Sequence, residues 1–165
     1  MPNFSDISSS PKSRIILVAV LGFIAVGIIG GLALSYANSI LRALNVRTEL
    51  THEFAQITPT TSLKQVNTID SFKPETVYFG AVYSSSQSPN NVFADNGTIL
   101  ESNGWVYHSI NNVTVWGKPT GGQQAIYCKG EYAAILEFRG PIVKSGWNYK
   151  LALDWIPGGS AYCRR

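Results

Sequence analysis

The stretch "SRIILVAVLGFIAVGIIGGLALSYAN", from Ser13 to Asn38, decides how the rest of the chain is interpreted. Its segment 15–37 has 23 residues and carries no charge. As a helix this segment would be about 35 Å long, which is enough to cross a hydrocarbon core of about 30 Å. The stretch is therefore predicted to form a transmembrane helix over 15–37, preceded by a short cytoplasmic tail over 1–14.

An apolar segment near an N-terminus can be a cleaved signal, a retained anchor or the stem of a filament subunit. A cleaved signal has an apolar core of roughly 7 to 15 residues, shorter than this one, although Ser35-Tyr36-Ala37 resembles a cleavage site. Gly27, Gly31 and Ser35 recur every four residues, a spacing of small residues that lets two helices approach closely in lipid. Because glycine is common in membrane spans, the spacing leaves open whether this face packs against another helix. We interpret the segment as a retained anchor with a candidate helix–helix packing face.

The orientation of this anchor is not decided by charge alone. Lys12 and Arg14 precede the segment and Arg42 and Arg47 follow it, so the positive charges on its two sides are nearly balanced. The short N-terminal tail, the long polar domain and the pair of cysteines favour a cytoplasmic N-terminus. We predict a single-pass protein of the cell membrane with its C-terminal domain outside the cytoplasm, in the periplasm or the extracellular space.

Apolar residues continue beyond the anchor at an approximate 3–4 spacing, which predicts an amphipathic helical extension over 38–58. Polar and charged residues fill the positions between them, and Pro59 ends the pattern. The apolar stripe must be buried on its own domain, on a neighbouring subunit or on the membrane surface, and its own domain is the simplest choice. The stripe consists of Ile40, Leu41, Leu44, Leu50, Phe54 and Ile57.

A Thr-rich linker is predicted over 59–75, followed by a β-rich domain over 76–165. Short alternating segments separated by turn residues are typical of an antiparallel sandwich or barrel. We therefore predict an α+β chain whose extracytoplasmic domain is an antiparallel, β-sandwich-like structure. Strands are expected at 76–83, 104–110, 113–116, 124–128, 131–139 and 147–155. In the last strand, one face is predicted to carry Trp147, Tyr149, Leu151, Leu153 and Trp155 and the other face to be in contact with water.

The chain has two cysteines, Cys128 and Cys163, and neither belongs to a CxxC motif. In an oxidising compartment they are predicted to form one disulfide that closes a loop of about 34 residues, worth roughly 4 kcal/mol in the chain-entropy model. Two free thiols are the alternative. The bond would tie the C-terminal end of the chain to the strand expected at 124–128.

Composition and motifs argue against several classes of function. The net charge of +3 is small and dispersed, whereas nucleic-acid binding needs a concentrated basic face. Nucleophile-elbow, phosphate-loop and metalloprotease motifs are absent, and nothing in the spacing supports His108 as a base with Asp95. With only two histidines, far apart at His52 and His108, no zinc site is predicted. We expect no enzyme activity, no cofactor, no metal and no nucleic-acid partner.

Aromatic residues are the one enriched chemical class in the predicted domain. The simplest interpretation is that most of them form its core. Exposed members would instead stack on sugars or anchor a protein partner. Trp105 and Trp116, which flank a hairpin expected at 111–112, are the candidates for an exposed contact.

The order of these features resembles the type IV pilin-like architecture, with its long apolar helix, amphipathic continuation, β domain and C-terminal cysteine loop. The resemblance implies a helix that packs into a filament core and a disulfide that closes the C-terminal loop. It covers layout and not motif, because Ser13-Arg14 stands where pilin precursors have Gly or Ala, and no acidic residue occurs within 15–37.

These patterns together predict a non-enzymatic, membrane-anchored protein. Its expected role is that of a structural, binding or assembly subunit of a larger envelope complex, with protein partners contacted through the helix and the β domain. Two alternatives are a pilin-like filament subunit and an accessory small subunit of a membrane enzyme or secretion machine.

Overall fold

The structure is a computed structural model that describes residues 11–57, 59–140 and 147–164. The chain divides into two compact units, Met1–Ser39 and Ile40–Arg165. Helix α1, Pro11–Gln56, begins in the first unit and ends in the second. The helical extension predicted over 38–58 therefore belongs almost entirely to the unit that holds the sheet, and the predicted tail over 1–14 lies mostly outside the described residues.

The described part of the first unit is the apolar part of α1. Every side chain from Val20 to Asn38 is exposed. By length and composition, α1 is apolar enough to cross a membrane, as the segment 15–37 predicts. The helix begins at Pro11, four residues before the predicted start, because no helix-breaking residue separates Pro11 from Ile15 and proline is well tolerated in a first helical turn.

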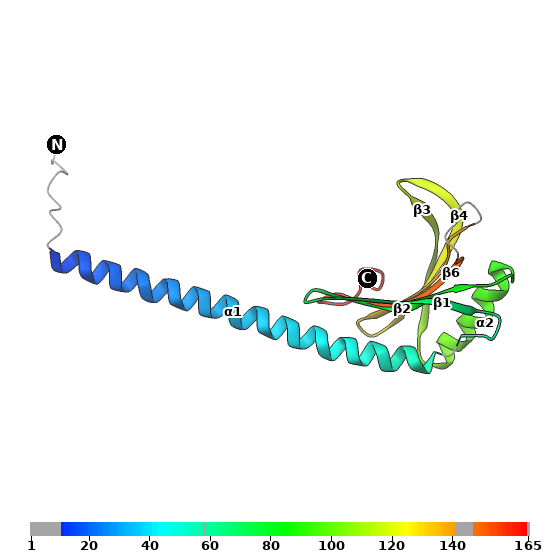
Figure 1. Ribbon diagram of the computed structural model, residues 1–165, viewed down its shortest axis with the longest axis horizontal. Helices are drawn as coiled ribbons and strands as arrows, with labels where there is room; N and C mark the ends of the chain where they lie inside the picture. The colour runs from blue at the N-terminus through cyan, green and yellow to red at the C-terminus, as the bar shows by residue number, and fades with distance from the viewer. Residues whose placement is uncertain (1–10, 58, 141–146, 165) are drawn as a thin grey trace. The chain divides into compact units, whose positions relative to one another are not determined.

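The second unit is built on one six-stranded antiparallel sheet in the order β1-β2-β6-β5-β4-β3. The last strand of the chain, β6, lies between β2 and β5 and so joins the β1–β2 hairpin to the β3–β4–β5 meander. The sheet twists strongly, so that the β3–β4 hairpin stands away from the plane of β1 and β2 (Figure 1). The strands are β1 Lys64–Lys73, β2 Thr76–Ser84, β3 Val106–Val115, β4 Lys118–Lys129, β5 Tyr132–Phe138 and β6 Tyr149–Trp155.

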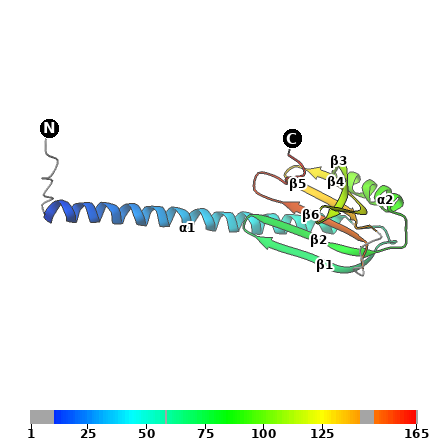
Figure 2. The same cartoon turned by 90° about the horizontal axis from the view of Figure 1, so that it is seen from above.

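The main core lies between one face of this sheet and two helices, the second half of α1 and α2, Pro89–Ser102 (Figure 2). The helices contribute fully buried apolar residues, among them Leu50 from α1 and Leu100 from α2. The strands contribute alternate residues, such as Leu151, Leu153 and Trp155 of β6, because successive side chains of a strand point to opposite faces. The face of β6 predicted from alternation is confirmed from Tyr149 to Trp155, but the predicted contact of its other face with water is wrong, because Ala152 is fully buried there and Lys150 is mostly buried.

The extension packs on its own domain, as predicted, and the predicted stripe is right in its C-terminal half and wrong in its N-terminal half. The buried residues are Ala43, Val46, Leu50 and Ile57, with Phe54 partly buried. Two members of the predicted stripe face outward instead, since Leu41 is 59% exposed and Leu44 is 41% exposed. The predicted stripe steps six residues from Leu44 to Leu50, whereas Ala43 and Val46 continue the 3–4 spacing of the buried residues without a break.

The predicted β-sandwich is not confirmed, because the described strands form a single sheet with helices on one face. The predicted linker over 59–75 is wrong for its second part, which is strand β1, paired along its length with β2. The two strands expected at 104–110 and 113–116 are one strand, β3, and its partner β4 extends back to Lys118. Helix α2 was not predicted, although Ser88 caps it and Pro89 starts it.

The opposite face of the sheet carries a second, smaller core. Ile126, Ala133 and Ile135 are buried there and are covered by Tyr78 and by the disulfide between Cys128 and Cys163. The C-terminal segment 156–164 is further held by buried Ser160, whose hydroxyl donates to Asp154 at 2.6 Å and whose backbone N–H donates to Glu131 at 2.9 Å. The C-terminal segment thus covers one end of this face and leaves the other end open.

Candidate binding groove

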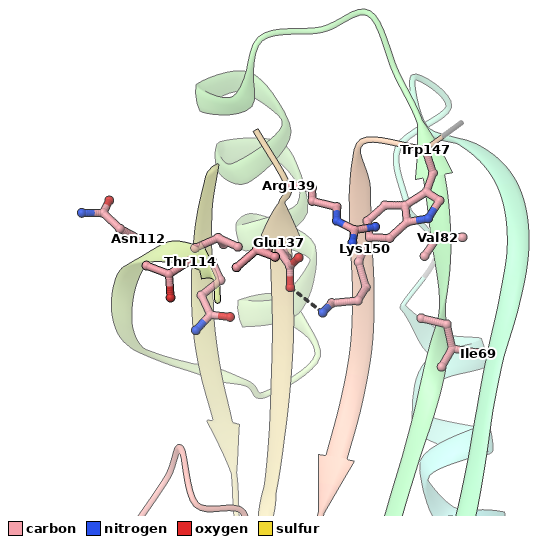
Figure 3. A pocket seen from close by; sticks show the side chains of 11 residues that line it. Ile69, Val82, Asn112, Thr114, Glu137, Arg139, Trp147 and Lys150 are labelled. Carbon is pink, nitrogen blue, oxygen red and sulfur yellow. Dashed lines mark ion pairs between the residues drawn. The ribbon is translucent and has the colours of Figure 1, made fainter. Parts of the chain in front are cut away.

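The open end of the sheet face that is turned away from the helices forms a groove of about 430 Å³ (Figure 3). Alternation places its lining on this face, since Val82, Lys150 and Glu137 alternate with core residues of β2, β6 and β5. The groove draws on every strand of the sheet. It is lined by Ile69, Val82, Asn112, Val113, Thr114, Val115, Gln124, Glu137, Arg139, Trp147 and Lys150.

The groove is concave because the β3–β4 hairpin bends across the end of the sheet. The pairing of β3 with β4 shifts between Val113 and Thr114, which marks an irregularity that increases local twist. Gly122 of β4 lies so close to β5 that a Cβ there would come within 2.3 Å of the Phe138 carbonyl oxygen. In the stretch "GKPTGG" (117–122), Gly117 belongs to the turn after β3, and the residues from Lys118 onward belong to β4, whose Gly122 permits this close approach.

A buried ion pair crosses the floor of the groove. Glu137 of β5 and Lys150 of β6 are directly opposite each other in the sheet and form a salt bridge. Their side chains are only 11% and 19% exposed, respectively. Burial by itself lowers the pKa of Lys150, but the neighbouring Tyr78 and Glu137 outweigh it and raise that pKa above its ordinary value. The ammonium group of Lys150 is therefore charged at neutral pH.

Arg139 supplies the remaining positive charge of the groove. Its guanidinium lies 4.7 Å from the centre of the Trp147 ring, a cation–π contact. Its backbone N–H donates to the Asn148 carbonyl at 3.0 Å, which holds the end of β5 next to the start of β6. Within the described residues no carboxylate forms an ion pair with this guanidinium.

This arrangement has side chains that are chemically suited to hold a carboxylate. The Arg139 guanidinium offers a planar fork that matches a carboxylate in a bidentate pair. Gln124 and Thr114 add amide and hydroxyl groups, while Val82 and Ile69 provide an apolar floor. His108 is exposed on β3 and does not line the groove. No group of His, Cys, Asp and Glu suited to a metal ion occurs in the described part of the chain.

The two tryptophans predicted as exposed contacts have opposite environments. Trp105 is 1% exposed, so that prediction is wrong for it: the indole belongs to the core beside α2, and its N–H has no hydrogen-bond partner there. Trp116 is 97% exposed and lies at the two-residue turn between β3 and β4. Its φ of 51° is in the left-handed region, which is unusual for a bulky residue and is found in the tight hairpin turn that the next residue, Gly117, completes.

The other predicted site residues lie in both units. Cys128 and Cys163 form the predicted disulfide. Gly27, Gly31 and Ser35 are exposed on α1, and a Cβ added at either glycine would meet nothing within 4 Å. Packing of another helix on this face stays a prediction.

Sequence reasoning missed the groove residues Glu137, Arg139 and Lys150. The one signal for them was alternation, which places Lys150 opposite the core face of β6. Trp147 was assigned to that core face, but it precedes β6 and lines the groove instead.

Comparisons with known proteins identify no family for this chain. The chain matches no protein-family model, no curated protein and no solved structure. The function is therefore argued from the geometry alone.

Replacing Glu137 by glutamine should lower the free energy of unfolding by about 2 kcal/mol, because the substitution leaves the mostly buried Lys150 ammonium without its counter-charge. Chemical denaturation followed by tryptophan fluorescence measures the change. Glu75→Gln, at an exposed position with no ion pair among the described residues, is the matched control and should change stability by less than about 0.5 kcal/mol. Equal effects of the two substitutions would contradict a structural role for the pair.

Proposed function

We propose that this chain is a single-pass membrane protein that holds its sheet domain outside the cytoplasm and serves there as a binding or assembly subunit of a larger envelope complex. The observation that carries the proposal is the combination of an uncharged, exposed helical segment with a disulfide-bonded domain on the same chain. An apolar helix of this length is stable in a bilayer, and a disulfide persists in an oxidising compartment. A chain that has both features is what we expect of an extracytoplasmic domain held by a membrane anchor.

A binding role is supported by the two features of the domain that its own folding does not use. Arg139 lines the groove together with apolar and amide side chains, and it has no ion pair with a carboxylate among the described residues. Trp116 follows Val115 directly, so the exposed indole lies at the end of the hairpin that forms one wall of the groove. Unusual backbone conformations cluster at functional sites, and tryptophan is enriched among the residues that dominate protein contacts.

Labelling with a membrane-impermeant maleimide in intact cells tests the orientation. A cysteine at the exposed position Ser86 should react without permeabilisation, whereas a cysteine added before residue 1 should react only after it. The chain should also stay with the membranes after an alkaline carbonate wash. The reverse labelling pattern, or a chain released by the wash, would contradict the proposal.

A pilin-like filament subunit is the second candidate function. It is favoured by the packing of the second half of α1 along an antiparallel sheet and by the disulfide that closes the C-terminal region. Intact-mass measurement distinguishes the two functions, because a pilin precursor loses the residues before its apolar segment. A mature chain that retains residues 1–14 would exclude the filament subunit.

A further inference from the structure

Arg139 differs from the other arginines whose side chains the structure describes. Arg42 and Arg47 pair with carboxylates of their own domain, and Arg164 donates to two backbone carbonyls of the C-terminal segment. The Arg139 guanidinium has no oxygen acceptor within the described part of the chain, and its contact there is with the Trp147 ring. Its N–H donors are therefore available to a ligand in the groove that Arg139 lines.

The one carboxylate among the described lining residues is not available to Arg139. Glu137 lies two residues before Arg139 on β5, but its carboxylate pairs with Lys150 of β6 (Figure 3). Both members of the pair are mostly buried, so they form a fixed part of the groove floor. Two of the three charged lining residues thus satisfy each other, and the third is a cation. A negatively charged group on a ligand would complement it.

The Arg139 side chain is held in place before any ligand arrives. Its guanidinium lies 4.7 Å from the centre of the Trp147 ring, and its backbone N–H donates to the Asn148 carbonyl at 3.0 Å. A long side chain that is already ordered loses less conformational entropy when it binds, so more of its interaction with a carboxylate contributes to affinity.

The rest of the lining favours a sugar over an extended peptide. The groove crosses the face of the sheet, and strands β2, β6, β5 and β4 are each paired on both sides, so their backbone groups cannot pair with a further strand. The face offers side chains instead: the amides of Asn112 and Gln124 and the hydroxyl of Thr114. Amides and hydroxyls donate and accept hydrogen bonds, which matches the hydroxyl groups of a sugar. The half-buried Trp147 indole adds apolar area beside them, and a sugar ring has both kinds of surface.

We propose that the groove binds an acidic oligosaccharide, whose carboxylate pairs with Arg139 and whose hydroxyls bond to the side chains of Thr114 and Gln124. The volume of about 430 Å³ lies within the roughly 300–1,000 Å³ of small-ligand sites, which suits a short oligosaccharide. The inference deepens the proposed binding role and rests on it, because a domain outside the cytoplasm is in contact with the polysaccharides of the cell envelope.

Isothermal titration calorimetry on the full-length chain in detergent micelles tests the proposal. The probe is a trimer of galacturonic acid, and its methyl ester is the matched ligand, with the same hydroxyls and no charge. The acid should bind with a Kd below about 1 mM, and the ester should bind at least about tenfold more weakly, because it cannot form the charge-assisted pair with Arg139.

Arg139→Gln should weaken binding of the acid at least about tenfold and leave binding of the ester unchanged. Arg139→Lys keeps the charge without the planar fork and should give an intermediate loss. Lys73→Gln is the matched control: it removes the same charge at an exposed position of β1 outside the groove lining, and should change the affinity by less than about twofold.

Thr114→Val tests the sugar contact independently of Arg139. Thr114 is exposed on β3, so the substitution should leave the fold intact, which circular dichroism checks for every variant. Loss of its hydroxyl should weaken binding of the acid and of the ester by the same factor. An unchanged affinity for both would contradict the sugar contact.

The other outcomes contradict the proposal in distinct ways. Equal binding of acid and ester, or equal losses from Arg139→Gln and Lys73→Gln, would contradict the carboxylate pair. Absence of binding by both sugars would contradict the ligand class, and tighter binding of acetylated trialanine than of the acid would replace the sugar by a peptide. Because calorimetry does not depend on orientation, the two proposals can fail separately. A reversed labelling pattern contradicts the proposed function alone, whereas an expected labelling pattern without binding of the acid contradicts only this inference.

Discussion

Replacing Leu50 by alanine should lower the free energy of unfolding of the fragment 40–165 by about 2–5 kcal/mol. Leu50 is fully buried in the core between α1 and the sheet, so its truncation removes apolar contacts and leaves a cavity. The fragment contains the whole second unit, whose helix is needed to cover the sheet. Urea denaturation followed by far-UV circular dichroism and by tryptophan fluorescence gives the free energy from two independent signals.

Leu41→Ala is the matched control for this substitution. It makes the same chemical change on the same helix, and helix propensity therefore changes equally, but Leu41 is 59% exposed. Its expected effect is less than about 0.5 kcal/mol. Equal losses at Leu50 and Leu41 would mean that this part of α1 does not dock on the sheet through the stripe that contains Leu50.

The difference between Leu50 and Leu41 also bears on why the buried face of the helical extension was predicted only in part. Leu41 and Leu44 are larger than Ala43 and Val46, and a prediction based on the size of the apolar side chain assigns the leucines to the core. Ala43 and Val46 are buried because they continue the helix face of Leu50 and Ile57, and Arg42 and Arg47 on that helix pair with Glu131 and Asp70 of the same domain. Those ion pairs join residues far apart in sequence, which periodicity cannot detect.

The strands were predicted where burial imposes a pattern. β6 is central and alternates clearly, and β2 is similar, so both were found. β1 is an edge strand with nearly every side chain in water, and its residues therefore show no alternation that would distinguish a strand from a linker. The residues of the candidate groove could not be predicted from the sequence for a related reason. Glu137 and Lys150 are neighbours only because the last strand enters the sheet between β2 and β5.

Replacing both Cys128 and Cys163 by serine should lower the free energy of unfolding by about 4 kcal/mol, or the melting temperature by roughly 10–20 °C. The expected loss of stability is large because the disulfide closes a loop that contains a central part of the sheet. The loop between the two cysteines contains β5 and β6, two central strands of the sheet. The bond therefore restricts the unfolded state of the segment that forms the middle of the sheet, and its effect should reach the global unfolding transition.

Thermal unfolding of the fragment 40–165 under oxidising conditions measures the difference. Addition of a reductant should bring the unsubstituted fragment close to the double variant and leave the double variant unchanged, which separates the bond from the side chains. Tyr162→Ser, at a 41% exposed position in the same C-terminal segment, is the control and should have a small effect. If the bond only held the C-terminal segment in place, its loss would speed amide exchange after Trp155 and leave the melting temperature unchanged. A lower melting temperature together with faster exchange throughout β5 and β6 is the result expected of a bond that stabilises the whole sheet.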